Sequence, residues 1–269
     1  MSLLRVCLPT TVLAIWALLA LIGPLLALQP NVMDLPHLLN GPSAAHWLGS
    51  DDLGRSVADR LVVGARTSCV VAFWVVTLSA VVGTFIGVMS AWCGGIVDHV
   101  VVRVVDVFLA FPGILLAIAL AGILGPGIEN VIFALAVVGW VGFARLARAQ
   151  TLSVKHREHV LAAVALGSGR ARIIWYHILP FISAPLIVES SFGIAGTVVA
   201  EAGLSFLGLG VQPPDASWGT MIRDGTQYLL VAPHLVLTPG IALMLVVISV
   251  NVLGDRLRDY LDVKTRLSD

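Results

Sequence analysis

Long apolar stretches separated by short polar segments dominate this sequence. A helix needs roughly 20 residues to cross the hydrocarbon core of a bilayer. Six stretches approach or exceed that length: Thr11–Leu28, Ser68–Trp92, Val104–Leu124, Ile128–Ala147, Ile182–Ala200 and Val231–Leu253. The pattern therefore predicts an all-α integral membrane protein with six transmembrane helices.

Composition supports this assignment and argues against several classes of function. The chain is 58% hydrophobic and 12% charged, with a mean hydropathy of +0.96 and a formal net charge of zero, so no overall field favours nucleic acid. No G-x-x-x-x-G-K-[ST], HExxH or GxSxG pattern occurs, so we expect neither an enzyme nor a chain that binds ATP by itself. The three cysteines form no CxxC motif, and we expect them to pack as small hydrophobic residues. Six of the seven histidines are scattered without ligand spacing, which predicts no metal site among them: His46, His99, His156, His159, His177 and His234.

The distribution of basic residues predicts an orientation. If the N-terminus is cytoplasmic, twelve of the 16 lysines and arginines lie on the cytoplasmic side. The outer side then holds only Arg55, Arg60, Arg66 and Arg223. This asymmetry obeys the positive-inside rule and predicts that both termini and the Gln150–Phe181 loop are cytoplasmic.

The order of polar and apolar segments predicts four regions. They are an N-terminal anchor helix (1–30), an extracytoplasmic loop (31–63), a core domain of five spans (64–255) and a cytoplasmic tail (256–269). Within the second region, the apolar stripe of Asp51–Val63 predicts an amphipathic helix on the membrane surface. Gly125-Pro126-Gly127 alone joins the third and fourth spans, which predicts a tight helical hairpin.

A second outer segment, 201–230, is unusually apolar. Its first part, EAGLSFLGLG, is too short to span and rich in glycine, which favours a re-entrant or interfacial piece. The following VQPPDASWG predicts a turn. A plain outer loop is the alternative, but a loop this apolar is expected to lie buried against protein or lipid.

Charges inside the apolar spans are costly in lipid and indicate function by default. Arg103 and Asp106 are three residues apart on one helix face, which predicts that they pair with each other. Glu189 has no partner in its own helix, and it could line an aqueous path or bond a neighbouring subunit. Glu201, at the outer end of its span, is expected to orient the glycine-rich segment that follows.

The cytoplasmic loop 150–181 contains the segment EHVLAAVALGSGRARIIWYHILP. Glu158 suits the positive end of a short helix, and Ala162 and Ala163 would let that helix approach another surface closely. Gly167 can adopt positive φ and end the helix. A second segment carries Arg170 and Arg172 and reaches the membrane at Pro180. A small, stiff helix of this kind suits docking to a soluble partner, although spacing alone also allows an ordinary amphipathic connector.

These residues resemble a known family. The coupling segment of ABC importer permeases has the pattern EAA, three residues, G, nine residues, I-x-LP. Ala162, Ala163, Gly167, Leu179 and Pro180 match it, whereas Leu161 replaces its Glu and His177 replaces its Ile. Four further segments resemble the C-type subunit of dipeptide, oligopeptide and nickel importers: HWLGSDDLGRSVADRLVVGARTS, VDVFLAFPGILLAIAL, EAGLSFLGLGVQPPDASWG and NVLGDRLRDYLD. The similarity runs in order from about His46 to Asp262.

The resemblance implies a type I ABC importer permease fold in the cytoplasmic (inner) membrane of a prokaryote. It also implies a homologous second permease, two ATP-binding subunits that use ATP and Mg, and an extracytoplasmic substrate-binding protein, with no cofactor in this chain. Glu158–His177 would take the force from the ATP-binding subunits. The outer mouth, on the side of the binding protein, would include Glu201, Ser205, Gly208, Gln212, Pro213 and Trp218.

The resemblance favours peptides as the substrate, with nickel chelates or haem as alternatives for the same machine. The competing hypothesis comes from another functional class. It is a standalone channel or a proton-coupled carrier, in which Glu189 would relay protons.

Overall fold

The computed structural model describes residues 4–44 and 46–266. Over these ranges the chain is helical apart from its connecting segments, and the described residues contain no strand, only an isolated bridge between Ser50 and Ser56. Three parts of the predicted regions lie outside the described residues: residues 1–3 of the anchor, residue 45 of the outer loop and residues 267–269 of the tail.

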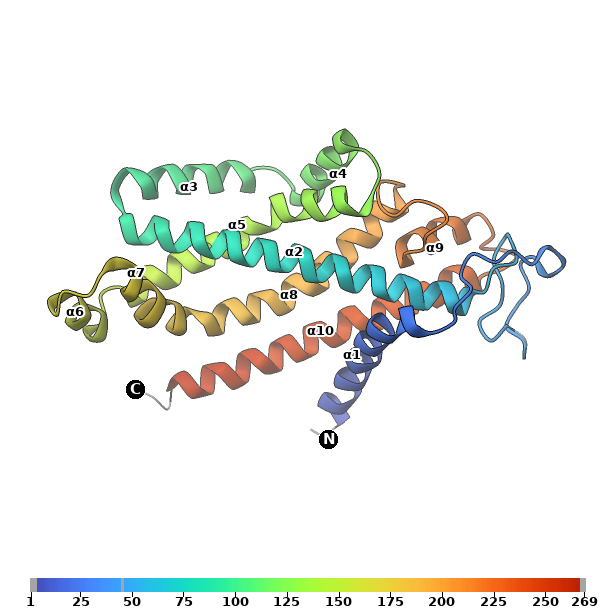
Figure 1. The fold of residues 1–269 in the computed structure, drawn as a ribbon, viewed down its shortest axis with the longest axis horizontal. Helices are drawn as coiled ribbons and strands as arrows, with labels where there is room; N and C mark the ends of the chain where they lie inside the picture. The colour runs from blue at the N-terminus through green and yellow to red at the C-terminus, as the bar shows by residue number, and fades with distance from the viewer. Residues whose placement is uncertain (1–3, 45, 267–269) are drawn as a thin grey trace.

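Ten α-helices make up the described fold (Figure 1). Their bounds are α1 Leu4–Ile22, α2 Val57–Cys93, α3 Gly95–Leu109, α4 Gly113–Leu124, α5 Ile128–Val154, α6 Glu158–Ala165, α7 Arg170–Ile173, α8 Leu179–Phe206, α9 Trp218–Thr226 and α10 His234–Arg266. Short 3₁₀ turns occupy Gly23–Leu25 and Leu35–His37, and Ile174–Ile178 forms one π-helical turn between α7 and α8.

The number of spans agrees with the prediction. Five helical segments are long and apolar enough to cross a membrane, and the bent pair α3 and α4 makes up to six. The predicted all-helical, multi-span fold class is confirmed. Three of the predicted elements differ from the structure in where their helices begin, bend or end.

The first difference concerns the predicted surface helix at Asp51–Val63. In the structure α2 begins at Val57 and continues without a break to Cys93, so the predicted boundary at residue 63 falls inside a single helix. The hydroxyl of Ser56 accepts a hydrogen bond from the backbone N–H of Asp59, which caps the helix at its start. The apolar stripe is explained by packing rather than by lipid, because Val57 is buried against Trp218 and Leu235.

The second difference concerns the third span, predicted as one helix from Val104 to Leu124. The chain instead forms α3 and α4, which meet at an angle of 85°. Pro112 lies at the break. A proline disfavours helical geometry in the residue before it and cannot donate a backbone hydrogen bond, so α3 ends at Leu109 and α4 begins at Gly113. The short Gly125–Gly127 connection to α5 is as predicted.

The third difference concerns α8. A span was predicted at Ile182–Ala200, but Arg170–Phe206 is helical throughout and Pro180 lies in the first turn of α8. A proline is tolerated there because first-turn N–H groups have no partner within the helix. The glycine-rich piece predicted to be re-entrant starts as the last turns of α8, and the chain then turns at Gly208, whose φ is +83°.

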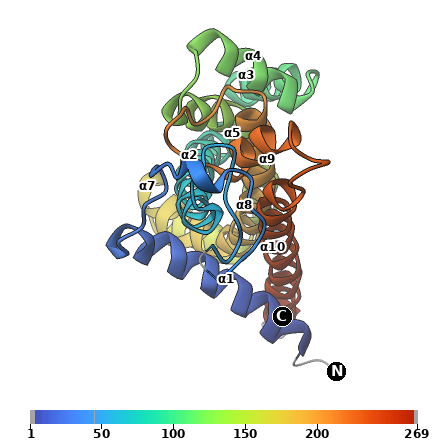
Figure 2. The ribbon, with the colours of Figure 1, turned by 90° about the vertical axis from the view of Figure 1, so that its right-hand side faces the viewer.

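The helices form an elongated bundle (Figure 1). α6 and α7 lie at one end, called here the α6 end, and α9 with the segment 23–56 lies at the other, the α9 end. α2 and α5 are in close backbone contact, because α2 has glycines at Gly83 and Gly87 where a Cβ atom would collide with α5. Viewed from the α9 end, α1 crosses one side of the bundle and α3 and α4 cover the opposite side (Figure 2).

Three clusters of buried apolar side chains hold the bundle together. The first joins α2, α9 and α10 near the α9 end, the second joins α2, α4, α5 and α8, and the third joins α5, α6 and the start of α8 at the α6 end. The third cluster matters for function because it fixes α6 to the long helices.

Candidate functional site

The short helix α6 has the boundaries that the sequence predicts. Glu158 is its first residue, where a carboxylate favours the positive end of the helix dipole. Gly167 ends it with a φ of +75°. The N–H of Gly167 donates to the Val164 carbonyl (2.9 Å) and the N–H of Ser168 donates to that of Ala163 (3.0 Å), which satisfies two otherwise unpaired carbonyls.

One face of α6 is seated on the bundle. Val160 and Ala163 are 1% and 5% exposed and pack with Ile173 and Ile178 in the third cluster. His159 stacks on Phe181 with ring centroids 4.4 Å apart. These contacts tie α6 to α5 and to the start of α8, so a force on α6 would be transmitted to both long helices.

The opposite face of α6 is apolar and uncovered within the described chain. Leu161 and Val164 are about half exposed, and Leu166 is 86% exposed. Ala162 and Ala163 were expected to share one contact surface, but only Ala162 is exposed. Neighbouring helical residues point about 100° apart, so the two alanines belong to different faces. The i, i+3 spacing of Leu161 and Val164 was the available signal for this face.

Basic and aromatic side chains extend the same surface. Arg170 and Arg172 on α7 are both exposed, and Trp175 and Tyr176 in the following π-helical turn are 68% and 73% exposed. Of the remaining predicted coupling residues, Pro180 is exposed whereas His177 and Leu179 are partly buried. The α6 end thus presents an apolar strip beside positive charge.

At the α9 end, Glu201 joins three elements. It is 1% exposed, and its two carboxylate oxygens accept hydrogen bonds from Ser205 (2.7 Å) and from Ser68 of α2 (3.1 Å). Ser205 lies against Gly210, at which a Cβ atom would collide with the serine side chain. Glu201 therefore holds α2 to α8 and contacts the residue that supports the following turn.

The remaining predicted outer-mouth residues separate into two groups. The side-chain amide of Gln212 donates to the carbonyls of Gly208 (3.1 Å) and Gly210 (2.9 Å), and Gln212 and Pro213 are exposed on the turn. Trp218 is instead 2% exposed and lies in the core, where its indole N–H donates to the Leu61 carbonyl (3.0 Å). The burial expected for 201–230 is thus found at Trp218 and Glu201, but not at Gln212 and Pro213.

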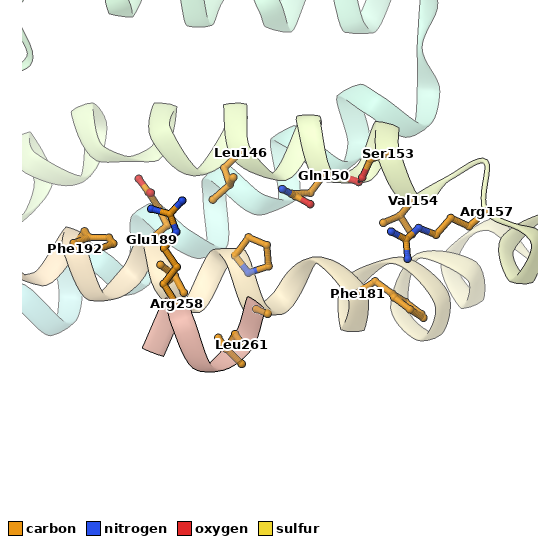
Figure 3. Close-up of a pocket in the computed structure, with 13 residues that line it drawn as sticks. Leu146, Gln150, Ser153, Val154, Arg157, Phe181, Glu189, Phe192, Arg258 and Leu261 are labelled. Atoms are coloured by element: carbon orange, nitrogen blue, oxygen red, sulfur yellow. The ribbon is translucent and has the colours of Figure 1, made fainter. Parts of the chain in front are cut away.

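Glu189 borders two cavities in the middle of α8. A cavity of about 700 Å³ extends from it between α5, α8 and α10 towards the α6 end, where it is lined by Gln150, Arg157 and Arg258. Figure 3 shows the side chains of Glu189 from α8, Arg258 from α10 and Gln150 from α5 around this space. A second cavity of about 290 Å³ lies between α2, α4, α5 and α8 and also reaches Glu189. Glu189 thus borders both spaces.

The expected pairing of Arg103 with Asp106 is wrong. Both side chains are exposed on α3, and among the residues that the structure describes they form no ion pair with each other. The charge pair of this region is Asp98 with Arg148, in which two parallel hydrogen bonds of 2.6 Å link α3 to α5. Nothing in the local sequence pattern indicates a partner 50 residues away.

Comparison with known proteins identifies relatives of this arrangement. The chain is 43% identical over 250 residues to the dipeptide transport system permease protein DppC of Alkalihalophilus pseudofirmus, covering 93% of this chain and 82% of the relative. It is 40% identical over 236 residues to the glutathione transport system permease protein GsiD of Pectobacterium atrosepticum, covering 88% and 78%. GsiD of Escherichia coli O6:K15:H31 is 41% identical over the same length.

A solved structure shares the fold. The MetNI methionine ABC transporter in an inward-facing conformation matches 75% of this chain and 95% of the solved chain, with a TM-score of 0.61 and 20% sequence identity. The family model of the binding-protein-dependent transport system inner membrane component matches residues 83–267, which include α6, Glu189 and Glu201. This chain therefore belongs to the family of binding-protein-dependent transport system inner membrane components, and it is a multi-pass permease subunit of an ABC importer.

Proposed function

We propose that this permease forms half of a peptide translocation path and that ATP-binding subunits drive it through α6. Two such subunits would use ATP and Mg, so this chain would contain neither a catalytic residue nor a cofactor. A homologous second permease would supply the other half of the path. The observation that carries the proposal is the division of α6 into a face packed on the long helices and an uncovered apolar face.

The uncovered face has the composition of a docking surface. An apolar centre with a polar rim is typical of protein interfaces, and an amphipathic helix commonly lays its apolar side into a groove. Here Leu161, Val164 and Leu166 supply the centre, and Arg170 and Arg172 supply a basic rim. The matching groove on a partner would be apolar with an acidic edge.

The buried face makes this docking mechanically useful. Because Val160 and Ala163 pack against Ile173 and Ile178, movement of α6 would carry α8 with it. α8 holds Glu189 at the two cavities and Glu201 at the α9 end. A shift at α6 could thus alter the path at Glu189 and the contact to α2 at Glu201, which is a two-state response to a remote ligand.

Peptides are the substrates that the relatives favour. The two kinds of relative described above are named for dipeptide and glutathione transport, and both substrates are small peptides with charged ends. Glu189 and Arg258 place opposite charges around one cavity, which suits a molecule that carries an amino group and a carboxylate. The standalone-carrier hypothesis is set aside, because the chain belongs to a family that works with a binding protein.

The orientation follows from the proposed partners. The α6 end would face the cytoplasm, where the ATP-binding subunits reside, and both termini would be cytoplasmic. The α9 end, with Gln212 and Pro213 exposed, would face the extracytoplasmic binding protein. The excess of basic residues on the α6 side supports this assignment.

Copurification tests the docking surface. The tagged chain is purified from its native membrane in mild detergent, and partners are identified by mass spectrometry. We expect a second permease and ATP-binding subunits with the unsubstituted chain. Val164→Arg should reduce the recovered ATP-binding subunits at least about tenfold, because it places a charge in the apolar centre. Leu229→Arg, which changes a comparably exposed apolar residue at the α9 end (47%, against 51% for Val164), should leave recovery unchanged.

Transport by the same complexes tests the substrate. Proteoliposomes that contain the complex and its binding protein should accumulate a labelled dipeptide only with ATP, and Val164→Arg should abolish that accumulation. Retention of ATP-binding subunits and uptake by Val164→Arg would contradict α6 as the docking element. ATP-dependent uptake of a nickel chelate or haem, without dipeptide uptake, would overturn the choice of substrate alone.

A further inference from the structure

Three metal-ligating side chains meet at the α9 end, in the segment that precedes α2. One carboxylate oxygen of Asp34 and one ring nitrogen each of His37 and His46 all lie within 4.8 Å of one another. The closest pair, Asp34 Oδ2 and His37 Nδ1, is 2.9 Å apart, and the rings of His37 and His46 are 6.0 Å apart. The three groups are far from α6 and from the cavities at Glu189.

The first two ligands are positioned by a short turn. Leu35–His37 is a 3₁₀ turn with Asp34 as its N-terminal cap residue, so the side chains of Asp34 and His37, three residues apart, lie on the same side. The backbone of Asp34 packs against Gly54, at which a Cβ atom would collide with it. The Ser50 hydroxyl donates a hydrogen bond to the His37 carbonyl. Both residues are thus anchored to the turn that leads into α2.

The third ligand is held by a separate turn. The backbone N–H of His46 donates to the Ser43 hydroxyl (3.1 Å), and the His46 carbonyl accepts from the N–H groups of Ser43 (2.8 Å) and Gly49 (2.9 Å). The adjoining Ser50 N–H donates to the Asn40 carbonyl (3.0 Å). His46 therefore reaches His37 from a hydrogen-bonded backbone rather than from a free loop.

The ligand set selects a class of ion. Two imidazoles and one carboxylate suit borderline divalent transition metals such as Zn²⁺, whereas Ca²⁺ and Mg²⁺ prefer oxygen ligands alone. Bonds of about 2.0–2.1 Å to a tetrahedral Zn²⁺ place neighbouring ligand atoms about 3.3 Å apart. The three ligand atoms lie within 4.8 Å of one another, and Asp34 Oδ2 and His37 Nδ1 are in hydrogen-bond contact at 2.9 Å, so small side-chain rotations would bring the ligands to that spacing.

We propose that Asp34, His37 and His46 form a binding site for a divalent transition-metal ion, with Zn²⁺ as the best match. Three protein ligands leave one tetrahedral position for water or for a group from another molecule. The bound ion would link the turn at Leu35–His37 to the turn at Ser43–Gly49, and so tie together the segment that covers the start of α2. His37 is 54% exposed at its side chain, so the ion can enter from solvent.

Metal titration of the purified full-length chain, in detergent and without a polyhistidine tag, tests the site. Cys7, Cys69 and Cys93 are replaced by serine, because thiols also bind these metals. Co²⁺ is the probe, since tetrahedral Co²⁺ absorbs strongly in the visible range, and Zn²⁺ is then used in competition. We expect one equivalent of Co²⁺ to bind at micromolar concentration or below and to be displaced by Zn²⁺.

Variants assign the binding to these residues. His37→Ala and His46→Ala should each weaken binding by about tenfold to a hundredfold or more. His99→Ala and His156→Ala, which change histidines outside the cluster, should bind Co²⁺ with unchanged affinity and stoichiometry. The melting temperatures of the metal-free variants should equal that of the metal-free parent, which shows that a loss of binding is not a loss of folding.

Limited proteolysis gives a second readout of the same proposal. Zn²⁺ should slow cleavage within residues 31–50 of the parent chain and leave the cleavage of His46→Ala unchanged. Binding only at millimolar concentration, or Co²⁺ spectra that persist unchanged in His37→Ala and His46→Ala, would overturn the site.

Discussion

Glu201 shows how much a single buried side chain can organise in this protein. Its carboxylate lies at the contact of α2 and α8, and two serine hydroxyls, from Ser68 and Ser205, donate to its two oxygens. A buried polar group is stable only when its hydrogen bonds are made, so the residue acts as a link between helices. The same turn of α8 leads into the segment that carries Gln212 and Pro213 on the surface.

At the residue scale, Glu201→Ala should lower the unfolding free energy by about 2–4 kcal/mol. The substitution opens a cavity and leaves two buried serine hydroxyls without an acceptor. Glu201→Gln keeps the shape and one acceptor oxygen, so its loss should be clearly smaller. The melting temperature of the purified chain in detergent measures both. A melting temperature of Glu201→Ala equal to that of the parent chain would contradict the role of Glu201 as a link between the helices.

Individual elements depend on contacts that lie far apart in the sequence. The bent pair α3 and α4 is attached to α5 by the Asp98–Arg148 pair, whose side chains are 19% and 31% exposed, and Asp98 also accepts from Ser90 of α2 (2.6 Å). A bidentate arginine–carboxylate pair with limited exposure is stronger than a typical surface ion pair. This contact fixes α3 beside the end of α2 and helps to hold the 85° bend.

At the element scale, removal of this pair should loosen α3 and leave the main bundle intact. A double-mutant cycle of Asp98→Asn and Arg148→Gln should give a coupling energy of about 1 kcal/mol. Hydrogen exchange should become faster in the amides of α3 and stay unchanged in those of α8. Arg103→Gln is the matched control, because Arg103 is an exposed arginine on α3 that forms no ion pair within the described chain. A coupling energy of zero would contradict a structural role for the pair.

The whole molecule is a bundle with two chemically different ends. The α6 end carries an uncovered apolar strip and exposed arginines, and the α9 end carries a compact segment with buried charges, in which Arg55 donates to Asp51 (2.7 Å). α8 runs between the two ends and passes Glu189 and its cavities on the way. This arrangement gives each proposed partner its own end of one continuous helical path.

At the scale of the whole molecule, the two ends should lie on opposite sides of the membrane. In a cysteine-free background, a cysteine at Leu166 should react with a membrane-impermeant maleimide only after the cells are opened. A cysteine at Leu230 should react in intact cells, because it is 99% exposed at the α9 end, whereas Leu166 is 86% exposed at the α6 end. Labelling of both positions in intact cells would contradict the proposed orientation and the docking role of α6.

Features that depend on local chemistry could be predicted from the residues alone. The lengths of the apolar stretches predicted the membrane spans, because the thickness of a bilayer sets the length of an apolar helix. Gly167 located the end of α6, because few other residues adopt its positive φ without strain. The ordered motifs between His46 and Asp262 identified the family, which the match over residues 83–267 then confirmed.

The packing of the helices sets which surfaces are covered and which distant residues meet, and neither could be predicted from local sequence. Packing against Trp218 and Leu235 turned a predicted surface helix into the start of α2, and it placed Trp218 in the core. Arg148 pairs with Asp98, whereas Arg103 does not pair with Asp106, because helix packing brings together residues that are distant in the sequence. The two faces of α6 and the cluster of Asp34, His37 and His46 arise in the same way. Short-range patterns encode secondary structure, whereas a site needs the three-dimensional path of the chain.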